Sequence, residues 1–289
     1  MSDTVALEQA DFKIVAAPHC GGAILSVEAN GRDLLRPGKL EAVRADRRAA
    51  ACFPCVPYFG RLYDGLSFGG RHWRQSPTFP AIDAGHALHG EGWVSEWEVA
   101  SHTENALTLV FHFNADEAGR FPFPYEATQT IVIDNNAVRV SLTLKNTGDT
   151  PMPGGLGLHP YFARRKDMAI SFNAGQYWTP PSAGARGTMG RLPDGLGSGR
   201  FAPPPSALRD HSYAGFAGAA TIVGAGGGVS LVSDAPILHV YAPEGEDYLC
   251  LEPVTHLPGA LTDPSGGFSG AVLSPGETAT LTMTVRSAG

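Results

Sequence analysis

The sequence has 289 residues, of which 36 are Gly, 23 are Pro and 43% are hydrophobic. So many Gly and Pro residues disfavour a helical protein, because Gly costs about 1 kcal/mol and Pro about 3 kcal/mol in a helix interior relative to Ala. The hydrophobic content and the lack of a three-residue glycine period exclude a disordered or collagen-like chain. With 21 basic and 28 acidic residues and no long basic run, the chain is a poor partner for nucleic acid and for anionic membranes.

The N-terminal residues include acidic side chains and no apolar stretch of about seven residues, so they do not resemble a secretory signal. No segment approaches the roughly eighteen apolar residues that a membrane-spanning helix needs. Four cysteines are too few to hold a chain of this length together by disulfides, which fits a reducing compartment. We therefore expect a cytoplasmic protein that does not bind membranes.

The first predicted elements are one short helix and then strands. The sequence EAVRADRRAAA predicts a helix over Glu41–Ala51, and Pro54 would end any helix that followed. Ala106–Asn114 is an apolar run typical of a strand. Tyr125–Asn146 alternates on both sides of a DNN sequence at residues 134–136, and this turn chemistry predicts a hairpin.

The C-terminal half is also predicted to consist of strands and turns. Trp178–Pro205 has no periodicity, which indicates a long functional or covering loop. Gly224–Gly228 precedes no helix, so a turn between strands is favoured over a phosphate-binding loop. The remaining predicted strands are Ala220–Val223, Val229–Ser233, Ile237–Ala242, Asp247–Glu252 and Thr278–Arg286. Without βαβ alternation or internal repeats, the sequence predicts an all-β protein, one large antiparallel sandwich in a single domain over residues 1–289.

Two short motifs have the spacing of metal or redox sites. Cys52 and Cys55 form a C-x-x-C motif, but there is no second such motif and no surrounding βαβ unit, so a buried pair of thiols is the better interpretation. His86 and His89 could be two metal ligands, but no third ligand with suitable spacing is evident. We therefore expect neither a metal ion nor a cofactor.

Four polar residues stand in apolar or Gly- and Pro-rich surroundings: Arg61, His89, His159 and Glu252. Burying such a group without a partner costs about 1 to 3 kcal/mol, so these positions are informative. Glu252 lies on an otherwise apolar strand face, where it is either a base with a tuned pKa or a carboxylate that reaches solvent at the strand end. His159 is either an acid and base near neutral pH or a core histidine with satisfied hydrogen bonds.

Together, the segments around these residues resemble the aldose 1-epimerases, the galactose mutarotase-like family. Their order and approximate spacing run across most of the chain, and the His-Pro-Tyr-Phe and Leu-Glu-Pro motifs are the most specific. The matching segments are Phe59–Leu62 with Asp64–Gly65, Leu88–Gly90, His159–Phe162, a weaker Asp210–Tyr213, and Leu251–Thr255. The resemblance implies a large antiparallel β-supersandwich that acts on a small-molecule sugar.

The resemblance also implies roles for individual residues. Glu252 would act as the general base that removes the proton from the sugar O1 hydroxyl, and His159 as the general acid that protonates the ring oxygen. Ring opening, rotation about C1–C2 and reclosure would then interconvert the α and β anomers of a hexose. Arg61 and His89 would bind the ring oxygen or adjacent hydroxyls, and Asp210 would accept hydrogen bonds from sugar hydroxyls. Such proton transfer requires no metal, cofactor or nucleophile.

Aromatic residues near the motifs could stack on a sugar face. The residues considered are Trp93, Tyr161, Tyr177 and Trp178, of which Tyr161 and Trp178 are assigned to the predicted binding site.

Two other functions stay open. A hexose-6-phosphate 1-epimerase would need additional cations beside the site to neutralise the phosphate. The candidates are Arg71, Arg74, Arg164 and Arg165. A noncatalytic carbohydrate-binding protein on the same fold needs neither a base nor an acid, so the presence of both His159 and Glu252 argues against it.

Overall fold

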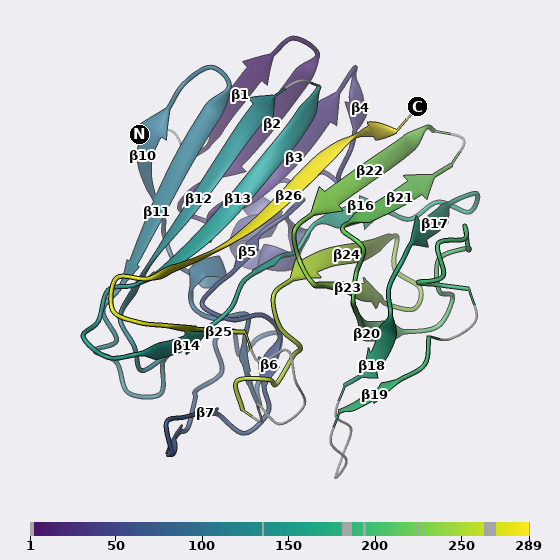
Figure 1. Ribbon diagram of the computed structural model, residues 1–289. Coiled ribbons are helices and arrows are strands. Elements are labelled where there is room, and N and C mark those ends of the chain that lie inside the picture. The colour runs from purple at the N-terminus through teal and green to yellow at the C-terminus, as the bar shows by residue number, and fades with distance from the viewer. Residues whose placement is uncertain are drawn as a thin grey trace.

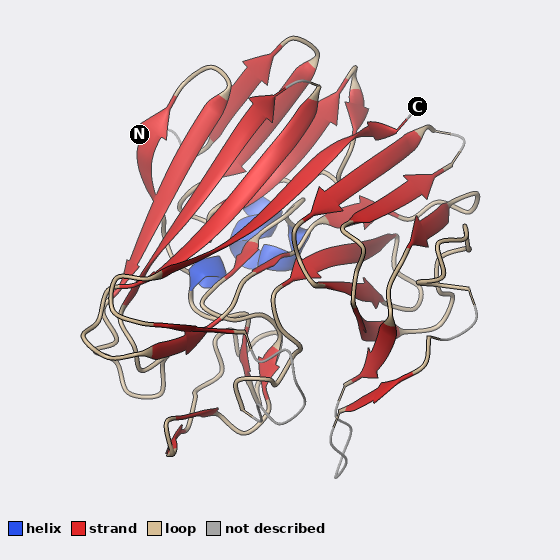
Figure 2. Cartoon of the chain, in the orientation of Figure 1, coloured by secondary structure: helices blue, strands red, loops and turns tan. Residues whose placement is uncertain are grey.

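The computed structural model describes residues 3–134, 136–180, 187–192, 195–224, 226–262 and 270–288. Antiparallel strands make up nearly all of its regular structure (Figures 1 and 2). Two sheets of eight strands dominate, accompanied by a four-stranded sheet and three two-stranded ones. The predicted all-β fold is therefore confirmed.

The first eight-stranded sheet contains the longest strands, and the C-terminal strand lies in its middle. In spatial order its strands are β10 (Glu98–His102), β11 (Ala106–Phe113), β12 (Tyr125–Asp134), β13 (Ala137–Asn146), β26 (Thr278–Ala288), β22 (Gly228–Ser233), β21 (Ala219–Val223) and β17 (Ala169–Phe172). From Tyr125 to Ile133, strand β12 alternates strictly between buried and half-buried side chains, as its sequence predicts for a sheet that packs on one face only. The hairpin predicted over Tyr125–Asn146 is formed by β12 and β13.

The second eight-stranded sheet is assembled from shorter segments that lie far apart in the sequence. In spatial order its strands are β19 (Thr188–Gly190), β18 (Gln176–Thr179), β20 (Arg209–Ala214), β23 (Ile237–Ala242), β24 (Tyr248–Val254), β15 (Gly157–Leu158) and β5 (Pro54–Cys55), and β16 (Tyr161–Ala163) also pairs with β24. Alternate residues of β24 enter two different hydrophobic clusters: Leu249 and Leu251 one, Cys250 and Val254 the other. The centre of this sheet is therefore covered on both faces.

The remaining elements are short. The four-stranded sheet contains β1 (Val5–Gln9), β2 (Phe12–Ala17), β3 (Ala23–Ala29) and β4 (Arg32–Asp33). The paired short strands are β14 (Met152–Gly154) with β25 (Ala271–Leu273), β6 (Arg61–Leu62) with β9 (Ala87–Leu88), and β7 (Leu66–Phe68) with β8 (Arg71–Trp73). The helical segments are α1 (Leu40–Ala45), η1 (Arg47–Ala49) and η2 (Gly92–Val94). Among the described residues, no helix is long and apolar enough to cross a membrane.

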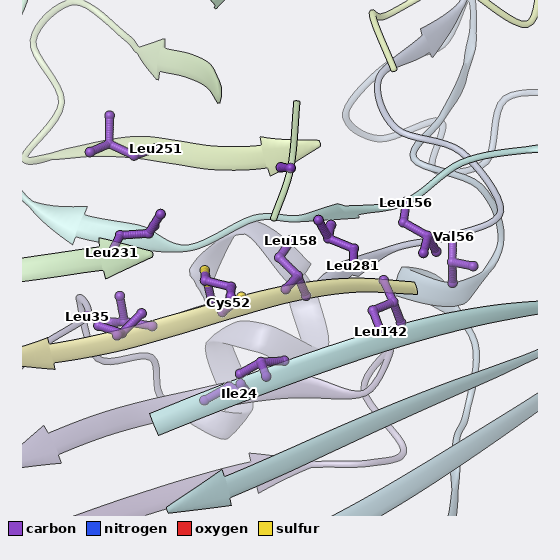
Figure 3. Close-up of a cluster of buried hydrophobic side chains, with 14 of the residues drawn as sticks. Ile24, Leu35, Cys52, Val56, Leu142, Leu156, Leu158, Leu231, Leu251 and Leu281 are labelled. Carbon is purple, nitrogen blue, oxygen red and sulfur yellow. The ribbon is translucent and has the colours of Figure 1, made fainter. Parts of the chain in front are cut away.

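The main hydrophobic core joins strands of several sheets. Ile24 of β3, Leu142 of β13, Leu251 of β24 and Leu281 of β26 belong to one buried cluster (Figure 3). Such packing removes apolar surface from water at about 25 cal/mol per Å², and it fixes how the second sheet lies against the first. The strands that carry the polar residues of interest are thereby held by a rigid core.

Two predicted segments differ from the structure. The helix expected over Glu41–Ala51 ends at Ala45, because Asp46 is extended and its carboxylate accepts the N–H of Arg48 at 2.9 Å, which starts the separate turn η1. The loop expected over Trp178–Pro205 contains β19, which pairs with the end of β18. Residues 181–186 and 193–194 of that segment lie outside the described residues.

Candidate active site

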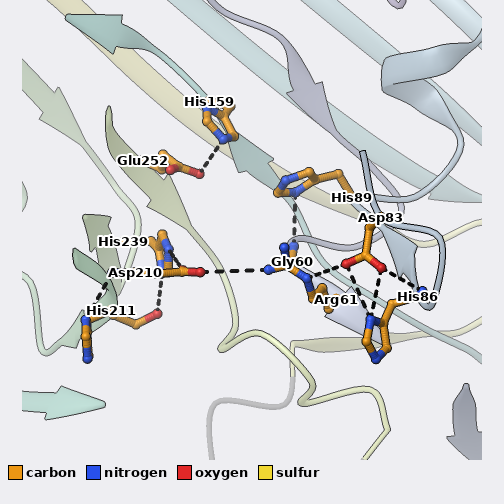
Figure 4. A network of polar contacts seen from close by, with 11 residues as sticks. Gly60, Arg61, Asp83, His86, His89, His159, Asp210, His211, His239 and Glu252 are labelled. Carbon is orange, nitrogen blue, oxygen red and sulfur yellow. Dashed lines mark hydrogen bonds and ion pairs between the residues drawn. The ribbon is translucent and has the colours of Figure 1, made fainter. Parts of the chain in front are cut away.

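Glu252 and His159 face each other because of the register of β24. Gly157 pairs with Val254 and Tyr161 with Cys250, so His159 lies opposite Glu252 in the gap between β15 and β16. The N–H of His159 donates to the carbonyl of Phe53 at 3.0 Å. His159 Nε2 lies 3.3 Å from Glu252 Oε2 (Figure 4).

Both side chains of this pair are almost completely withdrawn from water. Glu252 is 1% exposed, and neither of its carboxylate oxygens has a hydrogen-bond partner among the described residues. Burial, together with the charge of Asp210, raises the pKa of Glu252 well above its ordinary value. Burial, followed by the charge of His239, lowers the pKa of His159 to about 3. Burial therefore favours the neutral form of each group, the protonated carboxyl of Glu252 and the neutral imidazole of His159.

Aromatic rings fix the orientation of the His159 imidazole. Phe53 stacks on it with ring centroids 4.5 Å apart, and Tyr161 stacks on it at 4.8 Å. The Arg36 guanidinium lies 4.4 Å from the centroid of the Tyr161 ring. Tyr161 therefore supports His159 and has little free ring face to offer a ligand.

His239 lies beside Glu252 on the neighbouring strand β23, and the sequence analysis did not identify it. Across three adjacent strands, Ser212 of β20 pairs with His239 of β23, which pairs with Glu252 of β24. His239 Nδ1 lies 2.8 Å from Ser212 Oγ, and His239 Nε2 lies 2.9 Å from Asp210 Oδ1. Ser212 is fully buried and does not line the cleft, so this Ser-His-Asp arrangement orients Asp210 and provides no accessible nucleophile. The available signal was a histidine within the apolar run Ile237–Ala242.

Asp210 is ionised and is linked to Arg61. Burial opposes its ionisation, but the hydrogen bond to His239 and the charges of His239 and Arg61 outweigh this and lower the pKa of Asp210. Arg61 Nη1 lies 3.8 Å from Asp210 Oδ2, while Arg61 Nε donates to Asp83 Oδ2 at 2.7 Å. Asp83 Oδ1 also accepts the N–H groups of Gly85 and His86. Asp83 was missed because it lies in a loop whose sequence carries no motif.

His89 is positioned by a strained turn. Its φ is +57° and that of Gly90 is +72°; a Cβ on Gly90 would lie 2.2 Å from the carbonyl oxygen of Val56, so glycine is required there. His89 Nδ1 accepts the N–H of Gly60 at 3.1 Å, which assigns the proton of a neutral ring to Nε2. Burial keeps the ring neutral by lowering the pKa of His89 well below its ordinary value. The His89 and His159 rings meet edge to face, 5.4 Å apart.

These side chains share one cleft of about 160 Å³. Six of the seven predicted site residues line it: Arg61, His89, His159, Tyr161, Asp210 and Glu252. Trp178 does not; it is buried in β18 and belongs to a hydrophobic cluster. Apolar lining is provided by Phe53, Phe59, Ile82, Leu88 and Trp93.

The arginines considered for a phosphate lie elsewhere. None of Arg71, Arg74, Arg164 and Arg165 lines the cleft. Arg48 does line it, but its guanidinium is paired with the Asp46 carboxylate at 2.7 Å.

Comparison with known proteins identifies the family. The model of the aldose 1-epimerase family matches residues 3–286. The uncharacterized protein YphB of Escherichia coli strain K12 is 31% identical in an alignment of 279 positions that covers 92% of each chain. The crystal structure of an aldose 1-epimerase candidate from Escherichia coli K12 is 30% identical, with a TM-score of 0.87 over 99% of this chain and 98% of that chain. A galactose 1-epimerase from Lactobacillus acidophilus, 16% identical, shares the fold with a TM-score of 0.77 over 99% of this chain and 94% of that one.

The β-supersandwich fold and the resemblance stated from the motifs are thus confirmed. The match covers almost the whole sequence. The chain belongs to the aldose 1-epimerase family.

Proposed function

We propose that the protein is an aldose 1-epimerase that interconverts the anomers of a neutral hexose, with Glu252 as general base and His159 as general acid. The observation that carries this proposal is the 3.3 Å approach of His159 Nε2 to Glu252 Oε2 in a sugar-sized cleft. A carboxylate and an imidazole are the groups that such proton transfer requires.

The proton balance of the pair fits the reaction. One proton shared between Glu252 and His159 gives, after transfer within the pair, a carboxylate and an imidazolium. The carboxylate takes the O1 proton as the C1–O5 bond breaks, and the imidazolium gives its proton to O5, which yields the open-chain aldehyde. The pair then again holds one proton, and reclosure on the opposite face of the carbonyl reverses both transfers. No net proton is exchanged with solvent.

The surrounding groups suit sugar hydroxyls. The ionised Asp210 accepts hydrogen bonds, Arg61 donates them, and His89 offers a donor at Nε2. His239 holds Asp210 Oδ1, so the orientation of the acceptor is set before a ligand binds. A simple binding site would gain nothing from burying the Glu252 carboxyl without a hydrogen bond from the described residues, which disfavours the noncatalytic alternative.

Charge favours a neutral sugar over a hexose 6-phosphate. Among the described residues two arginines line the cleft, and both are already paired, Arg61 with Asp83 and Arg48 with Asp46. A phosphate dianion would therefore meet carboxylates with no uncommitted arginine of the described lining to balance it. The phosphorylated sugar stays the alternative substrate that the experiment must include.

Polarimetry on freshly dissolved α-D-glucose and α-D-galactose, in a buffer that contains a chelator, tests the proposal. The parent should accelerate mutarotation, and Glu252→Gln and His159→Ala should each lower the catalysed rate by about 10² to 10⁴. Glu244→Gln and His102→Ala, which alter exposed side chains, are matched controls and should retain the parent rate.

Two outcomes would contradict the proposal. If the parent is active and both variants, folded by circular dichroism, keep its rate, then the roles of Glu252 and His159 are wrong. If anomer exchange measured by NMR is accelerated only for glucose 6-phosphate and not for any free aldose, then the substrate class is wrong.

A further inference from the structure

Three potential metal ligands of different chemistry lie close together, and two of them, His159 and Glu252, line the cleft. His159, Cys250 and Glu252 each offer one ligand atom, and these atoms all lie within 4.8 Å of one another. Cys250 and Glu252 are two residues apart on β24, so their side chains lie on the same face of the strand. Cys250 is a free, fully buried thiol.

This set of donors suits a thiophilic divalent cation. Zn²⁺ binds thiolate sulfur at about 2.3 Å and imidazole nitrogen or carboxylate oxygen at about 2.0 Å, which puts the ligand atoms of a tetrahedral site roughly 3.3 to 3.6 Å apart. The separation of 3.3 Å between His159 Nε2 and Glu252 Oε2 already fits this geometry. The widest separation within the group needs to close by about 1 Å, which a rotation of the Cys250 side chain can provide.

An ion can reach these groups through the cleft, and the Glu252 oxygens can bind it there. His159 and Glu252 line the cleft, and Figure 4 shows their polar atoms turned toward each other. Both Glu252 oxygens lack a hydrogen-bond partner among the described residues, so their lone pairs are available to a cation. A buried carboxyl group without a hydrogen bond is costly, and a bound cation would relieve the cost.

The C-x-x-C motif adds further sulfur to the same region. Cys52 and Cys55 are free and fully buried, and burial, together with the charge of the Glu252 carboxylate when it is ionised, raises the pKa of both thiols. Burial, assisted by this charge, raises the pKa of the Cys250 thiol well above its ordinary value. The thiol therefore stays protonated while no ion is bound.

We propose that Zn²⁺ or Cd²⁺ binds Cys250 Sγ, His159 Nε2 and the Glu252 carboxylate, with water as the fourth ligand, and thereby inhibits the enzyme. On binding, the Cys250 thiol releases its proton to solvent, and the proton shared by Glu252 and His159 is released to solvent as well. The ion occupies the two groups that the reaction uses, so it competes with the sugar. Only the inhibition rests on the proposed function; the binding does not.

Titration of the chelator-treated, reduced protein with Cd²⁺ tests the site, because thiolate-to-cadmium coordination absorbs in the ultraviolet. The parent should bind one equivalent with this absorbance. Cys250→Ser and His159→Asn should each weaken binding by more than the roughly 10- to 100-fold that follows loss of a group supporting a ligand. Cys20→Ser, which alters a buried cysteine outside this group, is the matched control and should titrate like the parent.

The result that overturns the proposal is Cd²⁺ binding that is absent in the parent or unchanged in both Cys250→Ser and His159→Asn. His159→Asn keeps all four thiols, so it gives an answer even where Cys250→Ser does not fold. In polarimetry, Cd²⁺ should inhibit the parent and galactose should relieve the inhibition, while the activity left in Cys250→Ser should resist Cd²⁺. Cadmium binding that depends on Cys250 in a protein without mutarotase activity would refute the proposed function and leave the metal site standing.

Discussion

Glu91 anchors the loop that presents His89, and it makes the stability of the protein depend on pH. It is 3% exposed; one carboxylate oxygen accepts the N–H of Phe121 at 3.0 Å and the other accepts the hydroxyl of Tyr125 at 3.5 Å. Burial dominates over these interactions and raises the pKa of Glu91 from 4.5 to about 7. The carboxyl group is therefore easier to ionise in the unfolded chain than in the folded one.

The sign of the effect follows from proton linkage. Below about pH 4.5 Glu91 is protonated in both the folded and the unfolded state, so its ionisation does not lower the free energy of unfolding. As the pH rises from 4.5 through 7, the unfolded chain loses its proton first, so the folded state loses stability. A shift from 4.5 to about 7 corresponds to about 3 kcal/mol at 1.36 kcal/mol per pKa unit.

Glu91→Gln removes this titration while keeping an oxygen that can accept the Phe121 N–H. Relative to the parent, the variant should gain about 3 kcal/mol of unfolding free energy between pH 4 and pH 9. Urea unfolding, monitored by tryptophan fluorescence at several pH values, measures this difference. The other titrating groups are the same in the parent and the variant, so their contributions cancel. Glu98→Gln, which alters an exposed side chain of β10, is the control. A parent–variant difference that stays constant over this pH range would refute the reasoning.

Three further substitutions probe the cleft. His239→Phe removes a hydrogen bond to the charged Asp210, worth about 1.5 to 3 kcal/mol, so kcat/KM should fall about 10- to 100-fold in polarimetry; an unchanged value would mean that His239 does not orient Asp210. Arg61→Ala leaves Asp210 without its cationic neighbour and should raise KM for the free sugar at least about tenfold, whereas a change confined to kcat would contradict a binding role. Gly90→Ala should lower the melting temperature more than Gly69→Ala, because both glycines have positive φ but only the Cβ at position 90 meets backbone atoms; equal losses would exclude that contact as the cause.

The sequence analysis succeeded where a local pattern carries the information. The alternation of β12 and β13 around a turn follows from residues that are neighbours in the chain, and both strands form with the expected pairing. The helix predicted from Glu41 was too long because the residues that follow Asp46 are also good helix formers. In the structure Asp46 is extended, and its carboxylate accepts the N–H of Arg48, which begins a separate turn.

For the predicted site residues, too, the sequence was informative where a local pattern carried the information. Arg61, His89, His159 and Glu252 were identifiable because each is polar in apolar or glycine-rich surroundings, and all four line the cleft. Trp178 was selected only for being aromatic and close in sequence to other site candidates, and its ring packs into a hydrophobic cluster instead.

The residue types by themselves determined the abundance of strands, the chemistry available for proton transfer and the family. The tertiary structure decided which groups meet, because strand register brings together residues that are distant in the chain. The pairing of β24 with β15 and β16 sets Glu252 opposite His159, and the pairing of β23 with β24 sets His239 beside Glu252. The same register brings the Cys250 thiol within 4.8 Å of the ligand atoms of His159 and Glu252. Ladder hydrogen bonds and burial of both faces of β24 impose these contacts, and local sequence patterns do not encode them.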